Sequence, residues 1–217
     1  MSSAIKTVLF DLDGTIIDTN ELIIDSFIHA VSGVQLTREM IIPHMGTTLE
    51  NQLRVFSGLE DVHELEKAYR TYNLTHHDAM VNPFPYVQEV VQNLHSAGIR
   101  LGIVTTKIRP TTMKVLEMFD LYRYMDAVVT VTDITNPKPH AEPVLTALEI
   151  MGADPNTTLM VGDSPADIQS AQNAGVRSAA VAWSLKGEQV LSGYGPDHIL
   201  YDMRDLYKLT GTERKEA

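Results

Sequence analysis

Five short apolar runs, separated by stretches with helical spacing, constrain the fold of this chain more than any other feature. They read TVLF, RLGIVTT, DAVVTV, TLMVGD and RSAAVAW, starting at residues 7, 100, 126, 158 and 177. Runs of this kind are typical of parallel strands that are buried on both faces. Strands that alternate with helices predict an α/β fold, a Rossmann-like doubly wound parallel sheet with helices on both faces.

One region interrupts the alternation, because residues 19–81 show helical segments and no strand signal. Thr47 and Glu50 have the spacing of a capping box, which predicts the start of a helix there. We therefore expect a core domain of residues 1–18 and 82–217 and an inserted all-helical cap domain of residues 19–81. Because two linkers connect it to the core, such a cap could move as a lid. The alternative is an insert that only thickens the core.

Composition excludes several classes of protein. The chain has 217 residues, no cysteine and a formal net charge of −11, so thiolate chemistry is excluded and nucleic acid or an anionic membrane is disfavoured as a partner. No apolar stretch approaches the ~20 residues of a membrane span, and the N-terminus leads into a strand instead of a signal peptide. We expect a cytoplasmic protein, either a monomer or a weak homodimer.

Polar side chains follow the apolar runs at the points where the predicted strands end. In an open parallel sheet, ligands bind beyond these carboxyl ends. If the strands are neighbours, several carboxylates converge there with hydroxyls and an ammonium group. The candidate residues are Asp11, Asp13, Thr105, Thr106, Lys107, Lys138, Asp163 and Asp167.

Clustered carboxylates raise one another's pKa unless a cation lies among them. Oxygen ligands with room for water favour Mg²⁺, which works beside phosphate. Asp11 and Asp163, with the main-chain carbonyl of Asp13, are candidate ligands, and Asp167 would orient waters or a ligand. Threonine and lysine beside such an ion predict a phosphate site. Lys107 either reaches a second phosphate or is solvated.

A carboxylate in this site has a possible second role. Aspartate is a nucleophile in phosphoryl transfer, where an aspartyl-phosphate divides one hard step into two easier ones. That chemistry needs a group to protonate the leaving oxygen and later to deprotonate water, and Asp13 is suited to it. Gly14 would let the chain turn tightly under the phosphate, and Thr15 would brace that turn.

Four segments together resemble a known family. DLDGT at 11–15, Thr105 in GIVTT, Lys138 in PKP and GDSPAD at 162–167 are similar to the four motifs of the haloacid dehalogenase superfamily of phosphatases, in the family's order. The resemblance implies an aspartyl-phosphate mechanism, with Asp11 as nucleophile and Asp13 as acid and base. It also implies phosphate held by Thr105 and Lys138, and Mg²⁺ held by Asp11, Asp13 and Asp163. The predicted metal residues also include Asp167, and the predicted phosphate residues Gly14, Thr106 and Lys107.

Segments outside these motifs bear on the substrate. DGTIIDTNELI, PKPHAEPVL and VAWSLKG look like the bacterial pyrophosphatases linked to the HPr kinase/phosphorylase system, which cleave the inorganic pyrophosphate released by phosphorolysis of seryl-phosphorylated HPr. The resemblance implies a Mg²⁺-dependent pyrophosphatase with a small phosphorylated or pyrophosphate substrate. Phosphoglycolate phosphatases share most of these segments and are the alternative. A β-phosphoglucomutase-like isomerase and a decayed, non-catalytic binding protein are further ones.

The cap offers few candidates for substrate recognition. His76 and His77 are adjacent, about 100° apart on a helix, which disfavours a shared metal and indicates solvated or helix-capping histidines. His44 lies in a predicted loop, where a pyrophosphate contact and a packing role are both open. Trp183, at the end of the last apolar run, is expected to pack, with a place at the site's mouth or in a subunit contact as the alternative.

Overall fold

A six-stranded parallel sheet forms the centre of the computed structural model, which describes residues 4–213. The strand order is β5-β4-β1-β6-β7-β8, and β1 lies in the middle, as expected for a fully buried apolar run. All five predicted strands are present, and the predicted α/β class is confirmed. The strands are β1 (Thr7–Phe10), β4 (Arg100–Val104), β5 (Ala127–Val129), β6 (Thr158–Gly162), β7 (Arg177–Val181) and β8 (His198–Leu200).

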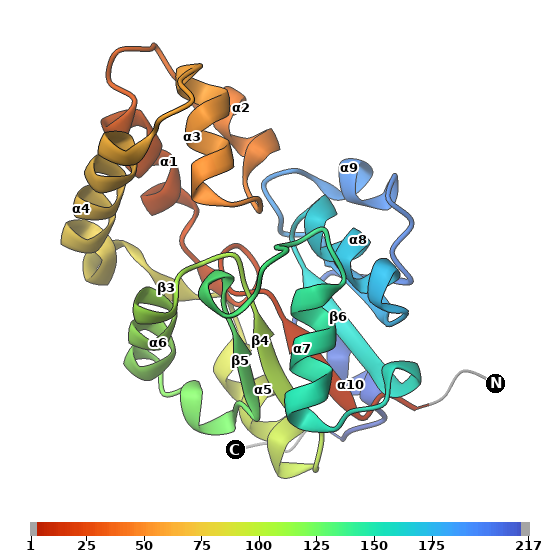
Figure 1. The fold of residues 1–217 in the computed structure, drawn as a ribbon. Helices are drawn as coiled ribbons and strands as arrows, with labels where there is room; N and C mark the ends of the chain where they lie inside the picture. Colours follow the sequence, from red (N-terminus) through yellow and green to blue (C-terminus); the bar gives the residue numbers. More distant parts are fainter. Residues whose placement is uncertain (1–3, 214–217) are drawn as a thin grey trace.

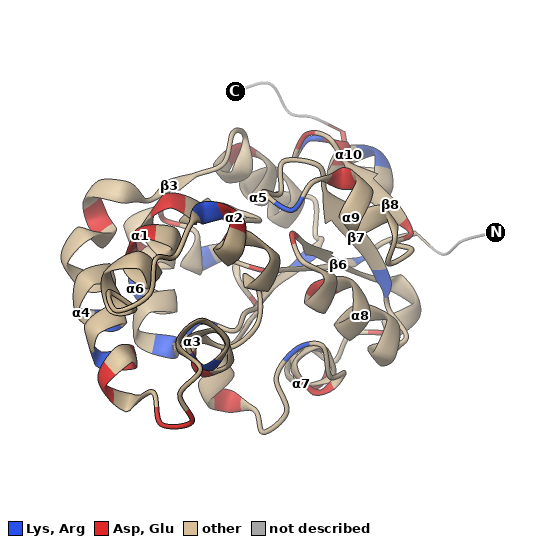
Figure 2. Cartoon of the chain, turned by 90° about the horizontal axis from the view of Figure 1, so that it is seen from above, with Lys and Arg blue, Asp and Glu red and all other residues tan. Residues whose placement is uncertain are grey.

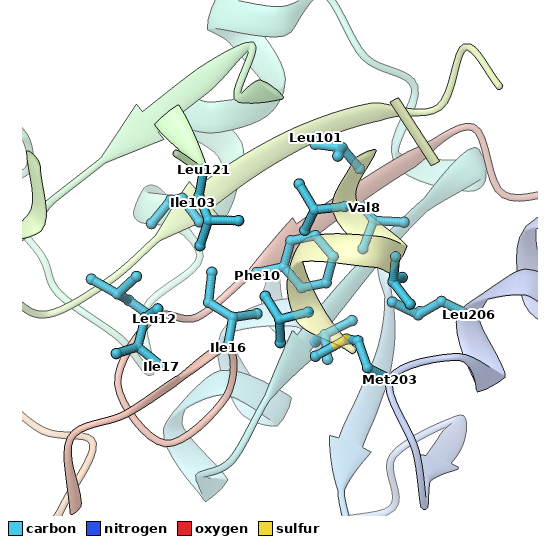
Figure 3. Close-up of a cluster of buried hydrophobic side chains, with 14 of the residues drawn as sticks. Val8, Phe10, Leu12, Ile16, Ile17, Leu101, Ile103, Leu121, Met203 and Leu206 are labelled. Carbon is cyan, nitrogen blue, oxygen red and sulfur yellow. The ribbon is translucent and has the colours of Figure 1, made fainter. Parts of the chain in front are cut away.

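Helices cover both faces of this sheet (Figure 1). Along β1 the side chains alternate, so that Val8 and Phe10 join one apolar cluster and Leu9 joins the other. The first cluster includes residues of α5, α6 and α10, and Figure 3 shows Phe10 at its centre with Leu206 nearby. The second includes residues of α7 and α8. The helices are α5 (Val87–Ser96), α6 (Arg109–Met118), α7 (Glu142–Met151), α8 (Pro165–Ala174), α9 (Glu188–Ser192) and α10 (Asp205–Thr210).

Four helices form the insert. The chain enters the insert through β2 (Ile17–Asp18) and returns through β3 (Asn82–Pro83), which pair as a small antiparallel ribbon. In Figure 1 they stand apart from the sheet as a lobe of their own. They bury a separate apolar cluster that includes Ile24, Phe27 and Leu53. The helices are α1 (Asn20–Ala30), α2 (Arg38–Ile41), α3 (Leu49–Ser57) and α4 (His63–Met80). An insert with its own apolar cluster does more than thicken the core.

Two sequence interpretations need correction. Thr47 does not cap α3; the N-cap is Thr48, whose side chain accepts a bond from the Asn51 amide, so the predicted capping box is wrong. Capping boxes do occur at Thr130 and at Ser164, where aspartate fills the place usually taken by Glu or Gln. The strands β2, β3 and β8 were not predicted, because two or three residues carry no measurable alternation. Short 3₁₀ turns lie at Ile42–His44, Tyr122–Tyr124, Val131–Asp133 and Pro155–Thr157.

Acidic and basic residues occur side by side on both the cap and the core (Figure 2). Figure 2 shows acidic and basic segments interspersed over the cap and the core, in a chain whose formal net charge is −11. Within residues 4–213, none of the helices combines the length and the apolar character needed to cross a membrane. With so acidic a chain, an anionic substrate would depend on cations placed locally in its site.

Candidate active site

The candidate residues meet at one edge of the sheet because three central strands are aligned. Phe10 pairs in register with Ile103 of β4 and with Val161 of β6. The residues that follow these strands therefore leave the sheet at the same level. The amide of Asp11 donates to the carbonyl of Val161 at 2.9 Å, which fixes the start of the first loop. Asp11, Thr105 and Asp163 are all buried at this edge.

Lys138 is the central cation of the site. Its Nζ donates to Asp11 Oδ1 at 2.7 Å, to Asp167 Oδ1 at 2.5 Å and to the carbonyl of Val104 at 3.0 Å. The side chain is only 2% exposed. Burial by itself lowers the pKa of Lys138, but the two carboxylates outweigh burial and hold the pKa above its ordinary value. Lys138 is therefore a permanent cation that joins two acidic residues.

Three buried carboxylates could hold a metal ion. Ligand atoms of Asp11, Asp163 and Asp167 all lie within 4.8 Å of one another. Burial raises the pKa of Asp11 to about 8; Lys138 opposes the shift and the two other aspartates add to it. Burial likewise raises the pKa of Asp163. Anions so placed are stabilised by a hard divalent cation, and the donor set of carboxylate oxygens fits one.

Hydrogen bonds separate the roles of these three carboxylates. Both oxygens of Asp167 are engaged, Oδ1 with Lys138 and Oδ2 with the amide and hydroxyl of Ser164 at 3.0 and 2.6 Å. Among the described residues, Asp11 Oδ2 and Asp163 Oδ1 have no hydrogen-bond donor. Asp11 Oδ2 and Asp163 Oδ1 are therefore better placed than Asp167 to bind a cation directly. Asp167 is placed to orient Lys138 and the start of α8.

The carboxylate of Asp13 is not one of the three clustered carboxylates. Its carboxylate accepts bonds from Lys107 Nζ, at 3.1 Å to each oxygen, and from Thr19 Oγ1 at 2.9 Å. The Lys107 side chain is 11% exposed, which rules out the alternative of a solvated lysine. Thr19 was not identified from the sequence, because nothing in its local pattern shows that the chain folds back onto Asp13.

Gly14 is needed for the close approach of the first loop to the metal cluster. Its φ is +80°, and a Cβ at this position would lie 2.7 Å from Asp163 Oδ2. Any side chain would therefore be strained and would displace a carboxylate. The structure thus gives Gly14 a second task beside the predicted tight turn.

A cavity of about 510 Å³ lies between the cap and the core. The core contributes residues predicted from the sequence, namely Asp11, Asp13, Thr105, Thr106, Lys107 and Asp163. The cap contributes residues that were not predicted, including Gln52 of α3 and Tyr69, Arg70 and Asn73 of α4. Their helical pattern does not say which side of α4 faces the core, so only the placement of the cap reveals them.

The cap histidines do not form a site. His44, His76 and His77 are all absent from the lining of the cavity. His77 is fully buried, with Nδ1 at 2.8 Å from Asp78 Oδ1, so the expectation of a solvated or capping residue is wrong for it. His76 stacks on the Tyr72 ring. Packing of Trp183 is confirmed, and its Nε1 donates to the carbonyl of Thr15 at 3.3 Å.

Comparisons with known proteins agree with this geometry. Residues 8–181 match the family model described as haloacid dehalogenase-like hydrolase. A protein of Bacillus mycoides named pyrophosphatase PpaX is 45% identical over 207 residues, which are 93% of this chain and 95% of that protein. The PpaX of Bacillus velezensis is 42% identical over 96% of this chain and 98% of its own length. A haloacid dehalogenase-like family hydrolase of Streptococcus pneumoniae shares the fold, with a TM-score of 0.82 at 23% identity over 94% of this chain and 97% of its own. Matches of this extent show that the chain belongs to the haloacid dehalogenase-like hydrolases.

Proposed function

We propose that this hydrolase cleaves inorganic pyrophosphate into two phosphates in a Mg²⁺-dependent reaction. The observation that carries the proposal is the buried cluster of Asp11, Asp163 and Asp167. Lys138 binds Asp11 and Asp167, and Asp11 and Asp163 reach a cavity that Asp13 also lines. Such an arrangement binds a divalent cation and an anion side by side. The two relatives named above are both called pyrophosphatase, and this chain matches them over nearly their whole length. That match supports pyrophosphate as the substrate.

Asp11 is the nucleophile in the proposed reaction. Lys138 holds its Oδ1, which orients the carboxylate for attack on phosphorus, and Oδ2 is the oxygen left for the cation. The attack forms an aspartyl-phosphate and releases the second phosphate. Lys138 stays close to the phosphoryl oxygens and stabilises the charge that they carry. Thr105 and Thr106 line the same cavity, and the turn at Gly14 lies against Asp163; these are the proposed phosphate contacts.

Asp13 moves the protons in this scheme. It lines the cavity beside Asp11, held by Lys107 and Thr19. It donates a proton to the leaving oxygen in the first step. In the second step it takes a proton from the water that attacks the aspartyl-phosphate, which releases phosphate and regenerates the Asp11 carboxylate. Mg²⁺, held by Asp11 and Asp163, would supply the positive charge that the acidic cluster needs beside a phosphate anion. Asp167 orients Lys138, and the sequence-based assignment of Asp13 as a further ligand stays a prediction.

The cap supplies a candidate for the second phosphate. Arg70 lines the cavity, and its pairing with Glu66 is loose, at 3.6 Å. A guanidinium at this place can bind the leaving phosphate bidentately. The cavity volume lies in the range of ordinary small-molecule sites. A cavity of this volume also has space for a phosphoglycolate-type ester, which is therefore the second candidate substrate.

Three sequence predictions accompany the proposal and remain predictions. They are a cytoplasmic location, a monomeric or weakly dimeric state, and the division into a core of residues 1–18 and 82–217 and a cap of residues 19–81. The separate apolar cluster of the insert supports the last of these. Sedimentation of the purified protein at two concentrations would test the oligomeric state.

A substrate panel with matched variants tests the function. Phosphate release from pyrophosphate, phosphoglycolate and glucose 1-phosphate is measured with Mg²⁺ and with EDTA. We expect the highest kcat/KM for pyrophosphate, no turnover in EDTA, and a loss on the order of 10³-fold or more in Asp11→Asn. The exposed Asp61→Asn is the control and should change turnover by less than about twofold. Undiminished turnover in Asp11→Asn would refute the mechanism, and preference for an organic monoester would refute the substrate.

A further inference from the structure

A short segment after β7, residues 183–186, contacts both the main chain and the carboxylate of Asp163, a proposed metal ligand. Ser184 Oγ donates to the main-chain carbonyl of Asp163 at 2.7 Å. Lys186 Nζ lies 3.5 Å from Asp163 Oδ2, and its side chain is 3% exposed. A buried ammonium group needs a counter-charge, and among the described residues Asp163 is its only ion-pair partner. Lys186 and Ser184 together therefore fix both the backbone and the carboxylate of Asp163.

Leu185, which lies between Ser184 and Lys186 in the chain, packs in the cap and not beside Asp163. Leu185 packs against the apolar cluster of the cap, which contains Ile24, Phe27 and Leu53. Within residues 4–213, every other hydrophobic residue in or against that cluster comes from the insert itself. One side chain of the core is thus part of the apolar cluster of the cap. Its place in the chain puts it directly between the two residues that hold Asp163.

We propose that residues 183–186 couple the position of the cap to the cation site, with Lys186 as a positioning residue for Asp163. Adjacent Cα atoms are about 3.8 Å apart, so Leu185 cannot follow the cap without moving its neighbours. When the cap packs on Leu185, Lys186 and Ser184 hold Asp163 in place. When the cap swings away, that restraint weakens. Binding of the cation and closure of the cap then favour each other, as linkage requires.

Lys186 acts through Asp163 and not on the substrate. It is not among the residues that line the cavity, whereas Asp163 is. Its contact with Oδ2 leaves Oδ1 without a hydrogen-bond donor in the described residues. Lys186 therefore restrains one oxygen of the ligand and leaves the other for the cation.

Cation binding by the full-length protein, without substrate, tests the coupling. The Kd for Mg²⁺ is measured by isothermal titration calorimetry in the parent, in Leu185→Ala and in Leu209→Ala. Leu209 is the matched control, because it is a partly buried leucine that packs on the sheet cluster instead of the cap. We expect Leu185→Ala to raise the Kd by about three- to tenfold and Leu209→Ala to change it by less than about twofold.

A second variant tests the route through Lys186. In a Lys186→Met background the effect of Leu185→Ala on the Kd should be at least about twofold smaller than in the parent, since only the bond from Ser184 then connects the segment to Asp163. An effect that stays as large as in the parent would overturn the role of Lys186. Hydrogen exchange gives a reciprocal readout: Mg²⁺ should slow amide exchange in α1 and α3 of the parent, and Leu185→Ala should abolish that slowing.

The coupling rests on the proposed cation site, and the outcomes separate the two. A parent protein that binds no Mg²⁺ would refute the cation site and the coupling together. A parent that binds Mg²⁺, with equal Kd values for Leu185→Ala and Leu209→Ala, would refute the coupling alone.

Discussion

Replacing Gly46 by alanine should separate the cap from the core without unfolding either. Gly46 lies in the cap between the 3₁₀ turn Ile42–His44 and α3, with φ +97°. A Cβ there would lie 2.6 Å from the Cβ of Ser164 and 2.7 Å from its Oγ. Ser164 cannot yield, because its hydroxyl and amide both bind Asp167. Ordinary contact begins near 3.4 Å, so the cap loop must withdraw by about 0.8 Å or more.

The expected loss follows from that displacement. Moving catalytic or substrate-binding groups by about 1 Å costs on the order of 100-fold in rate, or about 2.7 kcal/mol of barrier. We therefore expect kcat/KM for pyrophosphate to fall on the order of 100-fold in Gly46→Ala. The free energy of unfolding should fall by only about 1 to 2 kcal/mol, from the positive φ, since the cap keeps its own apolar cluster.

Gly58→Ala is the matched control for this prediction. Gly58 also lies in the cap and has φ +70°, but a Cβ there would meet nothing within 4 Å. It shares the backbone strain of Gly46→Ala without the contact to Ser164. Urea unfolding should show similar losses for both variants, and only Gly46→Ala should lose turnover. Equal kcat/KM values in the two variants would refute the argument that the site needs this approach of the cap.

Three further predictions concern the buried polar groups. In EDTA, the free energy of unfolding should fall as pH rises from 5 toward 8: burial raises the native pKa of Asp11 from 3.8 to about 8, so in this window the native state holds a proton that the unfolded state has lost. Urea titrations of the parent and of Asp11→Asn measure this, and an equal slope in both would contradict it. Lys138→Met leaves Asp167 buried without its cation and should cost about 3 to 5 kcal/mol at pH 7, whereas Lys114→Met loses only an exposed pair with Asp78 and should cost little; equal losses would count against it. Thr15→Val removes a buried hydroxyl that has no hydrogen-bond partner among residues 4–213, so the Tm should hold or rise, and a clear drop would show that this hydroxyl braces the turn.

The sequence was most informative where burial and chemistry are local. β1, β4 and β6 are surrounded by protein on both faces, which requires apolar side chains and makes the strands visible as runs. The positions of Asp11, Asp163 and Lys138 follow from strand ends in the same way. The local signal is too weak to read where an element is short, as in β8, or where a capping box has an unusual third residue, as with Asp167 in the box that Ser164 begins.

Tertiary structure alone decided which of these residues touch one another. The sequence placed Asp13 and Lys107 at one edge of the sheet, but only the folded loops show that Lys107 and Thr19 both bind the carboxylate of Asp13. Arg70 and Leu185 carry no motif, and they matter because the cap sits over the sheet edge. The physical reason is that local sequence sets backbone preference and burial, whereas a side chain's partner depends on strand order and on how two separately packed units meet.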